Sequence, residues 1–214
     1  MMLNYFDKHS LNAGRELAMY VSVRDVIVTH AGYNTVIEGL RELDVWAVEL
    51  VIDRDMTVTS LTDANQRLPL RTDADVDAYR RHLEENNVRV SALLLANNFN
   101  APNLDEELNW VIESIRRAHK LGCDAVRIDS AMRGEVELPF EERVERVVQC
   151  LKRVITATED TEMPLGIENH GRQGNDPAFL DAVMEGVGSP RLGLTLDTGN
   201  FYWYGHPLSQ VYEI

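Results

Sequence analysis

Two short apolar segments decide the fold: PLGIENHG at 164–171 and RLGLTLDTGN at 191–200. In an extended strand alternate side chains share a face, so Leu165 and Ile167 point one way and Glu168 the other. The second segment repeats this order, with leucines alternating with small or polar residues up to Asp197. Large aliphatic residues on one face and small or polar residues on the other are typical of a parallel barrel surrounded by helices.

Helical and strand patterns alternate along the rest of the chain. Apolar residues at helical spacing predict five helices, and runs rich in Val, Ile and Leu predict six strands, which together indicate an α/β protein with a parallel sheet. The predicted helices are 35–43, 73–86, 104–121, 139–155 and 176–184, and the predicted strands are 26–30, 45–52, 88–95, 125–129, 164–169 and 192–197. A short helix is also expected at 11–20, a long loop at 53–72 and a sixth helix from 208 onward.

The inward polar residues favour a barrel over an open sheet. No glycine-rich phosphate loop follows any predicted strand, which removes the usual sign of an open nucleotide-binding sheet. A complete barrel of this type typically needs about 250 residues. We therefore expect a single domain over 1–214, an incomplete (β/α)8-type barrel with about six βα units that lacks strands seven and eight.

Composition narrows the classes of function. The 214 residues carry a net charge of −14 and the pI is near 4.8, which argues against nucleic acid as substrate or partner. No apolar run is long enough to cross a bilayer and no signal peptide is evident, so a cytoplasmic location without membrane attachment is expected. Cys123 and Cys150 lack metal-type spacing and are expected to be buried, reduced thiols.

The two strand-end acids, Glu168 and Asp197, suggest a metal site. Two carboxylates about 4 Å apart repel by roughly 4 kcal/mol at an effective dielectric near 20, so converging acids need a cation, a shared proton or a basic partner. Oxygen ligands suit Mg²⁺ or Mn²⁺, and an added imidazole also admits Co²⁺ or Zn²⁺. For Asp197 alone a turn or helix-cap role is the competing interpretation. Glu49 and Arg127 lie at the ends of other strands and share the inward parity.

Four motifs in this order carry a family resemblance, which covers the chain from about residue 26 to its end. They are WAVEL at 46–50, AVRI at 125–128, GIENHG at 166–171 and LDTGN at 196–200. The chain resembles the sugar phosphate isomerase/epimerase family of xylose-isomerase-like TIM barrels, which also includes inosose dehydratases and endonuclease IV type enzymes. An endonuclease IV type enzyme would need more histidines at strand ends and a basic face, and neither is evident in this sequence.

The resemblance implies one divalent metal ion held by Glu, Asp, His and Glu from strands five to eight. Glu168 and Asp197 match the first two ligands, and the other two would lie beyond residue 214. The metal would polarise a substrate carbonyl while Glu168, as catalytic base, removes a proton to form an enediolate. A glutamate on the opposite face would be needed for epimerisation. Glu49, Arg127, His170 and Asn200 are implied to bind substrate.

The leading hypothesis is therefore a metal-dependent isomerase or epimerase of a small sugar or polyol, phosphorylated or not. An inosose-type dehydratase and an inactive truncated barrel remain open alternatives. Structural roles also remain open: Glu49 and Arg127 could form a buried ion pair, His170 could bond a loop carbonyl, and the aromatic run at 201–204 could pack on the barrel rim. Unpaired edges of the sheet would allow self-association into a homo-oligomer.

Overall fold

A six-stranded parallel sheet forms the centre of the molecule. The computed structural model describes residues 19–131, 133–134, 137–207 and 209. The strands lie in the order β1-β2-β5-β6-β7-β8, and every neighbouring pair is parallel. They are β1 (Val23–Arg24), β2 (Ala47–Val51), β5 (Arg89–Leu94), β6 (Ala125–Asp129), β7 (Leu165–Glu168) and β8 (Leu192–Thr195). The prediction of an incomplete barrel with six parallel strands is confirmed.

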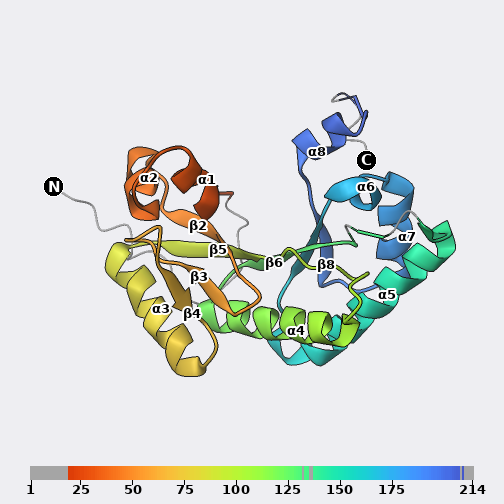
Figure 1. Cartoon of the computed structure of the whole chain (residues 1–214), viewed down its shortest axis with the longest axis horizontal. Coiled ribbons are helices and arrows are strands. Elements are labelled where there is room, and N and C mark those ends of the chain that lie inside the picture. The colour runs from red at the N-terminus through yellow and green to blue at the C-terminus, as the bar shows by residue number, and fades with distance from the viewer. Residues whose placement is uncertain (1–18, 132, 135–136, 208, 210–214) are drawn as a thin grey trace.

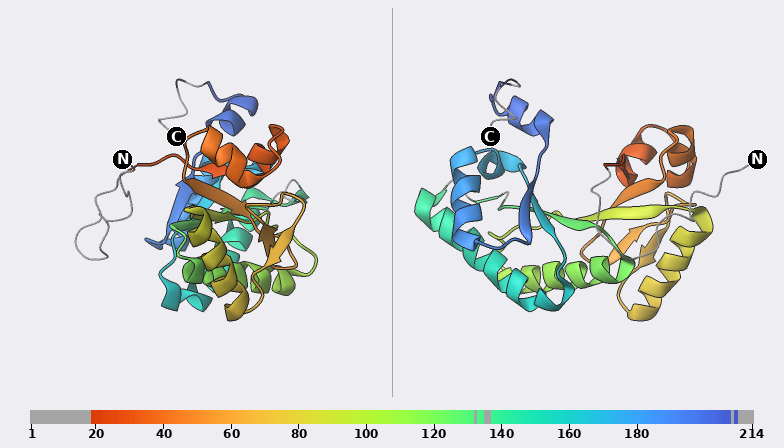
Figure 2. Two further views of the ribbon diagram at one scale, coloured as in Figure 1. Left: turned by 90° about the vertical axis from the view of Figure 1, so that its left-hand side faces the viewer. Right: turned by 180° about the vertical axis from the view of Figure 1, so that it is seen from behind.

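Helices follow the outer face of this curved sheet. Figure 1 shows α3, α4, α5 and α7 in an arc around one face, with α1 and α2 at one end and α8 at the other. The view from behind in Figure 2 shows the same arc, with the N-terminal and C-terminal elements at opposite ends. The helices are α1 (Asp25–His30), α2 (Val36–Glu42), α3 (Asp73–Asn86), α4 (Leu104–Leu121), α5 (Phe140–Ala157), α6 (Gly171–Gly174), α7 (Pro177–Val187) and α8 (Thr198–Trp203), with a short 3₁₀ turn, η2 (Glu159–Thr161).

The hydrophobic core lies between the sheet and these helices. The outward-facing strand residues Leu50, Ile128 and Ile167 are almost fully buried, as are Ile115 of α4 and Leu151 of α5. Each such side chain contributes roughly 1.5–3 kcal/mol through burial. The core thus fixes which strand residues point inward, away from the helices.

Capping residues set most helix ends where the sequence predicts them. Thr72 and Asp75 form a reciprocal capping box at the start of α3, and Gly122 ends α4 with a φ of 78°. Asp176 caps α7 by accepting a hydrogen bond from the backbone N–H of Ala178. Gly188, with a φ of 61°, ends α7, and it is one of the two glycines, at 186 and 188, that the sequence predicts as the stop of this helix.

The predicted strand at 26–30 is wrong. These residues belong to the helix α1, and the first strand is the two-residue β1 before it. The β-branched run Val-Ile-Val-Thr favours a strand by local propensity. Burial follows helical spacing instead: Asp25 and Val28, three residues apart, are buried, whereas Ile27 is 57% exposed.

The predicted loop at 53–72 contains a small antiparallel hairpin. Its strands are β3 (Thr57–Thr59) and β4 (Arg67–Pro69). Arg67 holds the hairpin against the sheet by donating hydrogen bonds to the carbonyl oxygens of Val51 and Thr57. Strands of only three residues are too short to give a clear alternating pattern, so the sequence does not predict this hairpin.

The C-terminal edge of the described sheet is less covered than the sequence pattern predicts. Leu194 and Leu196, expected to pack beneath helices, are each 48% exposed, and no described strand pairs with the outer edge of β8. The aromatic run at 201–204 covers the end of α8 and its C-cap, and in it Phe201 is buried but Trp203 is 80% exposed. Most residues of the helices predicted at 11–20 and from 208 onward lie outside the described residues, and the described residues Met19 and Tyr20 belong to no helix or strand. No described helix is long and apolar enough to cross a membrane.

Candidate active site

The inward-facing strand residues line one hollow on the concave face of the sheet. Its volume is about 710 Å³, and it contains side chains from both edges of the sheet, including Arg24 of β1 and Thr195 of β8. Four residues singled out from the sequence line it together: Glu49, Arg127, Glu168 and Asp197. Ligand sites commonly measure roughly 300–1,000 Å³, so the hollow has the size for a small substrate.

Arg127 is the central cation of this site. It forms ion pairs with the carboxylates of Glu168 and Asp129, and its Nη1 donates a hydrogen bond to the carbonyl oxygen of Leu95. The side chain of Arg127 is only 7% exposed, so these ion pairs are shielded from solvent. The alternative that Glu49 and Arg127 form an ion pair is not observed in the described residues; Arg127 is engaged with acids on its own and the adjacent strand.

Asp129 is a site residue that the sequence analysis did not single out. Its carboxylate is fully buried, with Oδ1 2.9 Å from Nη2 of Arg127. Asn97 holds its backbone from both sides, since Asn97 Nδ2 donates to the Asp129 carbonyl and Asn97 Oδ1 accepts from the Asp129 N–H. Its inward parity, two residues after Arg127 in the same strand, is the signal that could have identified it.

His170 follows β7 and extends this polar cluster. Its Nδ1 lies 3.3 Å from Asp129 Oδ1 and 3.2 Å from Arg127 Nη2. The hydrogen bond to Asp129 raises the pKa of His170 above its ordinary value, partly offset by burial. His170 therefore contacts side chains of the cluster, and the alternative of a bond to a loop carbonyl is not observed among the described residues.

Asp197 and Glu168 are connected through Asn200. Asp197 Oδ1 accepts the backbone N–H of Asn200 and thereby caps α8, while Asn200 Nδ2 donates to Glu168 Oε1 at 3.3 Å. Asn169 fixes Asp197 by two further bonds: its Oδ1 accepts the Asp197 N–H at 2.6 Å and its Nδ2 donates to the Asp197 carbonyl at 2.7 Å. The cap role foreseen for Asp197 is thus observed, and its carboxylate still lines the hollow.

The donor groups fit a hard divalent cation. Glu168 and Asp197 offer carboxylate oxygens at the ends of adjacent strands, and each oxygen retains a further lone pair beside the bonds described. A second arrangement is also present, since Asp129, Glu168 and His170 place potential ligand atoms within 4.8 Å of one another. Asp129 Oδ2 is buried and has no hydrogen-bond partner among the described residues. In that arrangement the guanidinium of Arg127 already lies against both carboxylates.

Glu49 differs from the other acids of the hollow. No ion pair or hydrogen bond of its carboxyl group is present among the described residues, although it is partly buried. Burial raises the pKa of Glu49 above its ordinary value, and the charges of Glu168 and Asp25 act in the same direction, whereas Arg24 and Arg127 lower it. The neutral carboxyl is therefore more favoured at Glu49 than at an ordinary glutamate.

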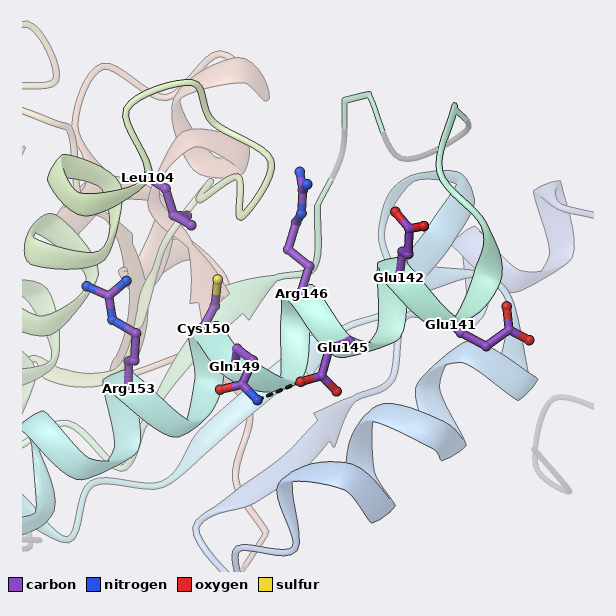
Figure 3. A pocket seen from close by; sticks show the side chains of 8 residues that line it. All are labelled: Leu104, Glu141, Glu142, Glu145, Arg146, Gln149, Cys150 and Arg153. Atoms are coloured by element: carbon purple, nitrogen blue, oxygen red, sulfur yellow. Dashed lines mark hydrogen bonds between the residues drawn. The ribbon is translucent and has the colours of Figure 1, made fainter.

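A second hollow, of about 550 Å³, lies on the outer surface of α5 and contains none of the predicted site residues. Figure 3 shows Arg146, Arg153 and Cys150 among its lining side chains, with Gln149 donating a hydrogen bond to Glu145. The arginines bind surface partners, and burial raises the pKa of Cys150 to about 11, so its thiol stays protonated at neutral pH. Both cysteines are buried and free, as predicted.

Comparison with solved structures places this architecture among known proteins. A xylose isomerase domain protein from Planctomyces limnophilus is similar at 17% identity and a TM-score of 0.62, covering 90% of this chain and 70% of that one. The probable 3-DHS dehydratase AsbF from Bacillus anthracis is similar at 13% identity and a TM-score of 0.66, covering 91% and 69%. An L-ribulose 3-epimerase is similar at 16% identity and a TM-score of 0.64, covering 86% and 62%.

These likenesses show the shared fold, and the chain spans about two thirds of the length of the similar structures. No curated protein matches the sequence. A family model, described as xylose isomerase-like TIM barrel, matches residues 37–214. This match includes β2, β5, β6, β7 and β8 with the acids they carry. The chain belongs to the family of xylose isomerase-like TIM barrels.

Proposed function

We propose that this protein is a divalent-metal-dependent isomerase or epimerase of a small sugar or polyol. The observation that carries the proposal is that Glu168 and Asp197, at the ends of adjacent strands, both line one hollow and both bond Asn200. The family and the epimerases among the structurally similar proteins support the same class of reaction. The substrate is a small molecule that fits a hollow of about 710 Å³.

Glu168 and Asp197 would hold the metal ion, as Mn²⁺, Co²⁺, Mg²⁺ or Zn²⁺. The ion, when bound, supplies electrostatic polarisation of a substrate carbonyl and the adjacent hydroxyl. Glu168 is proposed as the base that removes the proton from the neighbouring carbon. Arg127, His170 and Asn200 are proposed to bind substrate oxygens, with Arg127 also suited to an acidic substituent such as a phosphate group.

Exchange of a substrate proton with solvent tests this proposal. The chain is incubated with Mn²⁺ and either L-ribulose or D-tagatose in D₂O, and deuterium incorporation next to the carbonyl is followed by NMR. We expect incorporation with the parent chain and none with Glu168→Gln. Glu84→Gln, an exposed residue of α3 away from the hollow, is the matched control and should behave as the parent.

A dehydratase is the second candidate, because the similar structures include a probable 3-DHS dehydratase. The same base could remove the proton, but water would then leave the substrate. Incubation with an inosose, with absorbance of the unsaturated product as readout, separates the two. If the chain is instead an inactive barrel, neither substrate will be turned over. If it self-associates through the exposed edge at Leu194 and Leu196, light scattering will show a mass that rises with protein concentration.

A further inference from the structure

The outer face of α5 carries its charges in two blocks. Along this helix every exposed acid comes before every exposed base. The acids are Glu141, Glu142 and Glu145, and the bases are Arg146, Lys152 and Arg153. Figure 3 shows the three acids towards one end of the helix and Arg153 towards the other. The helix therefore presents an acidic half and a basic half to solvent.

The partners of these charges within the chain are weak. No ion pair of Glu141, Glu142 or Glu145 is present in the part of the chain that the structure describes. Arg153 pairs with Asp105 of α4, but the two side chains are 56% and 82% exposed. An ion pair as exposed as this one contributes little to stability and can exchange its partner. Both halves of the helix thus remain available to charges from outside the chain.

The hollow of about 550 Å³ lies beside this charged face. Leu104 and Cys150 line it between the two charged halves, and Cys150 is only 2% exposed. Protein interfaces commonly have such an arrangement, with an apolar centre and a polar rim. The face of α5 therefore has both the charges and the apolar floor that a second protein surface could contact.

We propose that the outer face of α5 is an interface between two copies of this chain, related by a two-fold axis near Gln149. In a two-fold contact the two helices run antiparallel, and every contact occurs twice. Arg153 of one copy then lies beside Glu145 of the other, with Glu142 one helical turn away. A parallel alignment would place like charges against each other. The occupant is a second copy because α5 itself supplies both of the complementary surfaces.

The association is expected to be weak. One helix face buries less area than a standard interface between stable partners. The net charge of −14 also makes two copies repel each other. At an ionic strength of about 0.15 M this repulsion is screened beyond roughly 8 Å, whereas the close contacts between Arg153 and Glu145 are screened less. A dimer that forms only at high protein concentration is therefore expected.

Charge reversal tests the interface directly. In a two-fold contact Glu145→Arg sets two arginines against each other twice, and Arg153→Glu does the same with two glutamates. Each variant should therefore associate at least about tenfold more weakly than the parent. Mixing the two variants restores opposite charges at both contacts, so the mixture should associate at least as tightly as the parent. Sedimentation equilibrium of the full chain gives the mass, which for the parent should rise from 24.3 kDa towards twice that value.

Two controls separate this interface from other contacts. Glu84→Arg and Arg81→Glu reverse charges at exposed positions of α3, and alone or mixed they should associate like the parent. Leu194→Glu alters the exposed edge at β8 and should leave the association unchanged. Circular dichroism checks that each variant keeps the parent's helix content.

Each contrary result overturns the interface at α5. A parent chain that stays monomeric up to about 1 mM, the weak end of measurable affinities, does so. Association that Leu194→Glu abolishes would place the contact at the edge of β8 instead. Single variants that associate like the parent, or a mixture as weak as the single variants, would show that Glu145 and Arg153 do not face each other. None of these results bears on the proposed function, because the α5 face lies outside the hollow that contains Glu168.

Discussion

Arg127 and Asp129, two residues apart on β6, form an ion pair of 2.9 Å in which the aspartate is fully buried. Arg127 also reaches Glu168 on β7 and His170 beyond it, so this pair connects a fully buried aspartate to the proposed base. Buried charges are tolerated only when they are paired and hydrogen-bonded. The pair therefore leaves neither buried charge without a partner and orients the guanidinium towards the carboxylate of Glu168.

Replacing Asp129 by Asn removes one charge of this buried pair. We expect the free energy of unfolding to fall by about 3 kcal/mol, the lower end for breaking a buried ion pair, because Arg127 retains Glu168. Urea unfolding followed by circular dichroism measures the change. Asp105→Asn is the matched control, since Asp105 pairs with Arg153 at the exposed surface and should cost little. Equal losses for the two variants would contradict the importance of burial here.

His82 predicts a pH dependence of stability. Its Nε2 accepts the backbone N–H of Leu61 at 3.0 Å, which requires an unprotonated nitrogen, and burial lowers the pKa of His82 below its usual value. Because the pKa of His82 is lower in the folded state, its neutral imidazole contributes to the free energy of unfolding. This contribution is fully present above the unfolded-state pKa of about 6.5 and is lost as pH falls through the folded-state pKa.

We expect the loss of stability between pH 7.5 and pH 5 to be smaller in His82→Gln, which keeps an acceptor without a proton to bind. Urea unfolding at both pH values gives the comparison. His119→Gln, at an exposed position of α4, should retain the parent's full pH dependence. An unchanged pH dependence in His82→Gln would show that the Leu61 bond does not depend on the charge of the imidazole.

Asn169 is predicted to support Asp197 as a metal ligand. It is 2% exposed and bonds both backbone groups of Asp197. Asn169→Ala should lower stability by about 2 kcal/mol by leaving buried polar groups unpaired, and should weaken Mn²⁺ binding about tenfold by releasing Asp197. Asn86→Ala, which removes one helix-end bond to His82, should leave Mn²⁺ affinity unchanged. Unaltered metal affinity in Asn169→Ala would contradict this supporting role.

Much of the fold could be predicted because most helices carry a regular apolar spacing over several turns and recognisable capping residues. The helices α3 and α4 and the strand β6 begin and end at the predicted residues, since their periodicity and end residues are unambiguous. The helix at 25–30 could not be predicted, because its β-branched residues favour a strand and its helical face is apparent only from burial. The three-residue strands of the hairpin are too short for a pattern.

The site could be predicted in outline from strand parity, which brings Glu49, Arg127, Glu168 and Asp197 into one hollow. The partners of each residue could not be predicted from the sequence, because ion pairing depends on how far side chains from different strands reach into the hollow. Arg127 thus pairs with Asp129 and Glu168, leaving Glu49 without an ion pair among the described residues.

Binding of Mn²⁺ by isothermal titration calorimetry tests the central claim most directly. The parent chain, Glu168→Gln and Asp197→Asn are compared, and Asp176→Asn is the matched control, because Asp176 and Asp197 both cap helices and asparagine can still cap. We predict micromolar binding by the parent and by Asp176→Asn, and none by the other two variants. Binding that survives both substitutions, or a parent chain that binds no Mn²⁺, would contradict a metal site at Glu168 and Asp197.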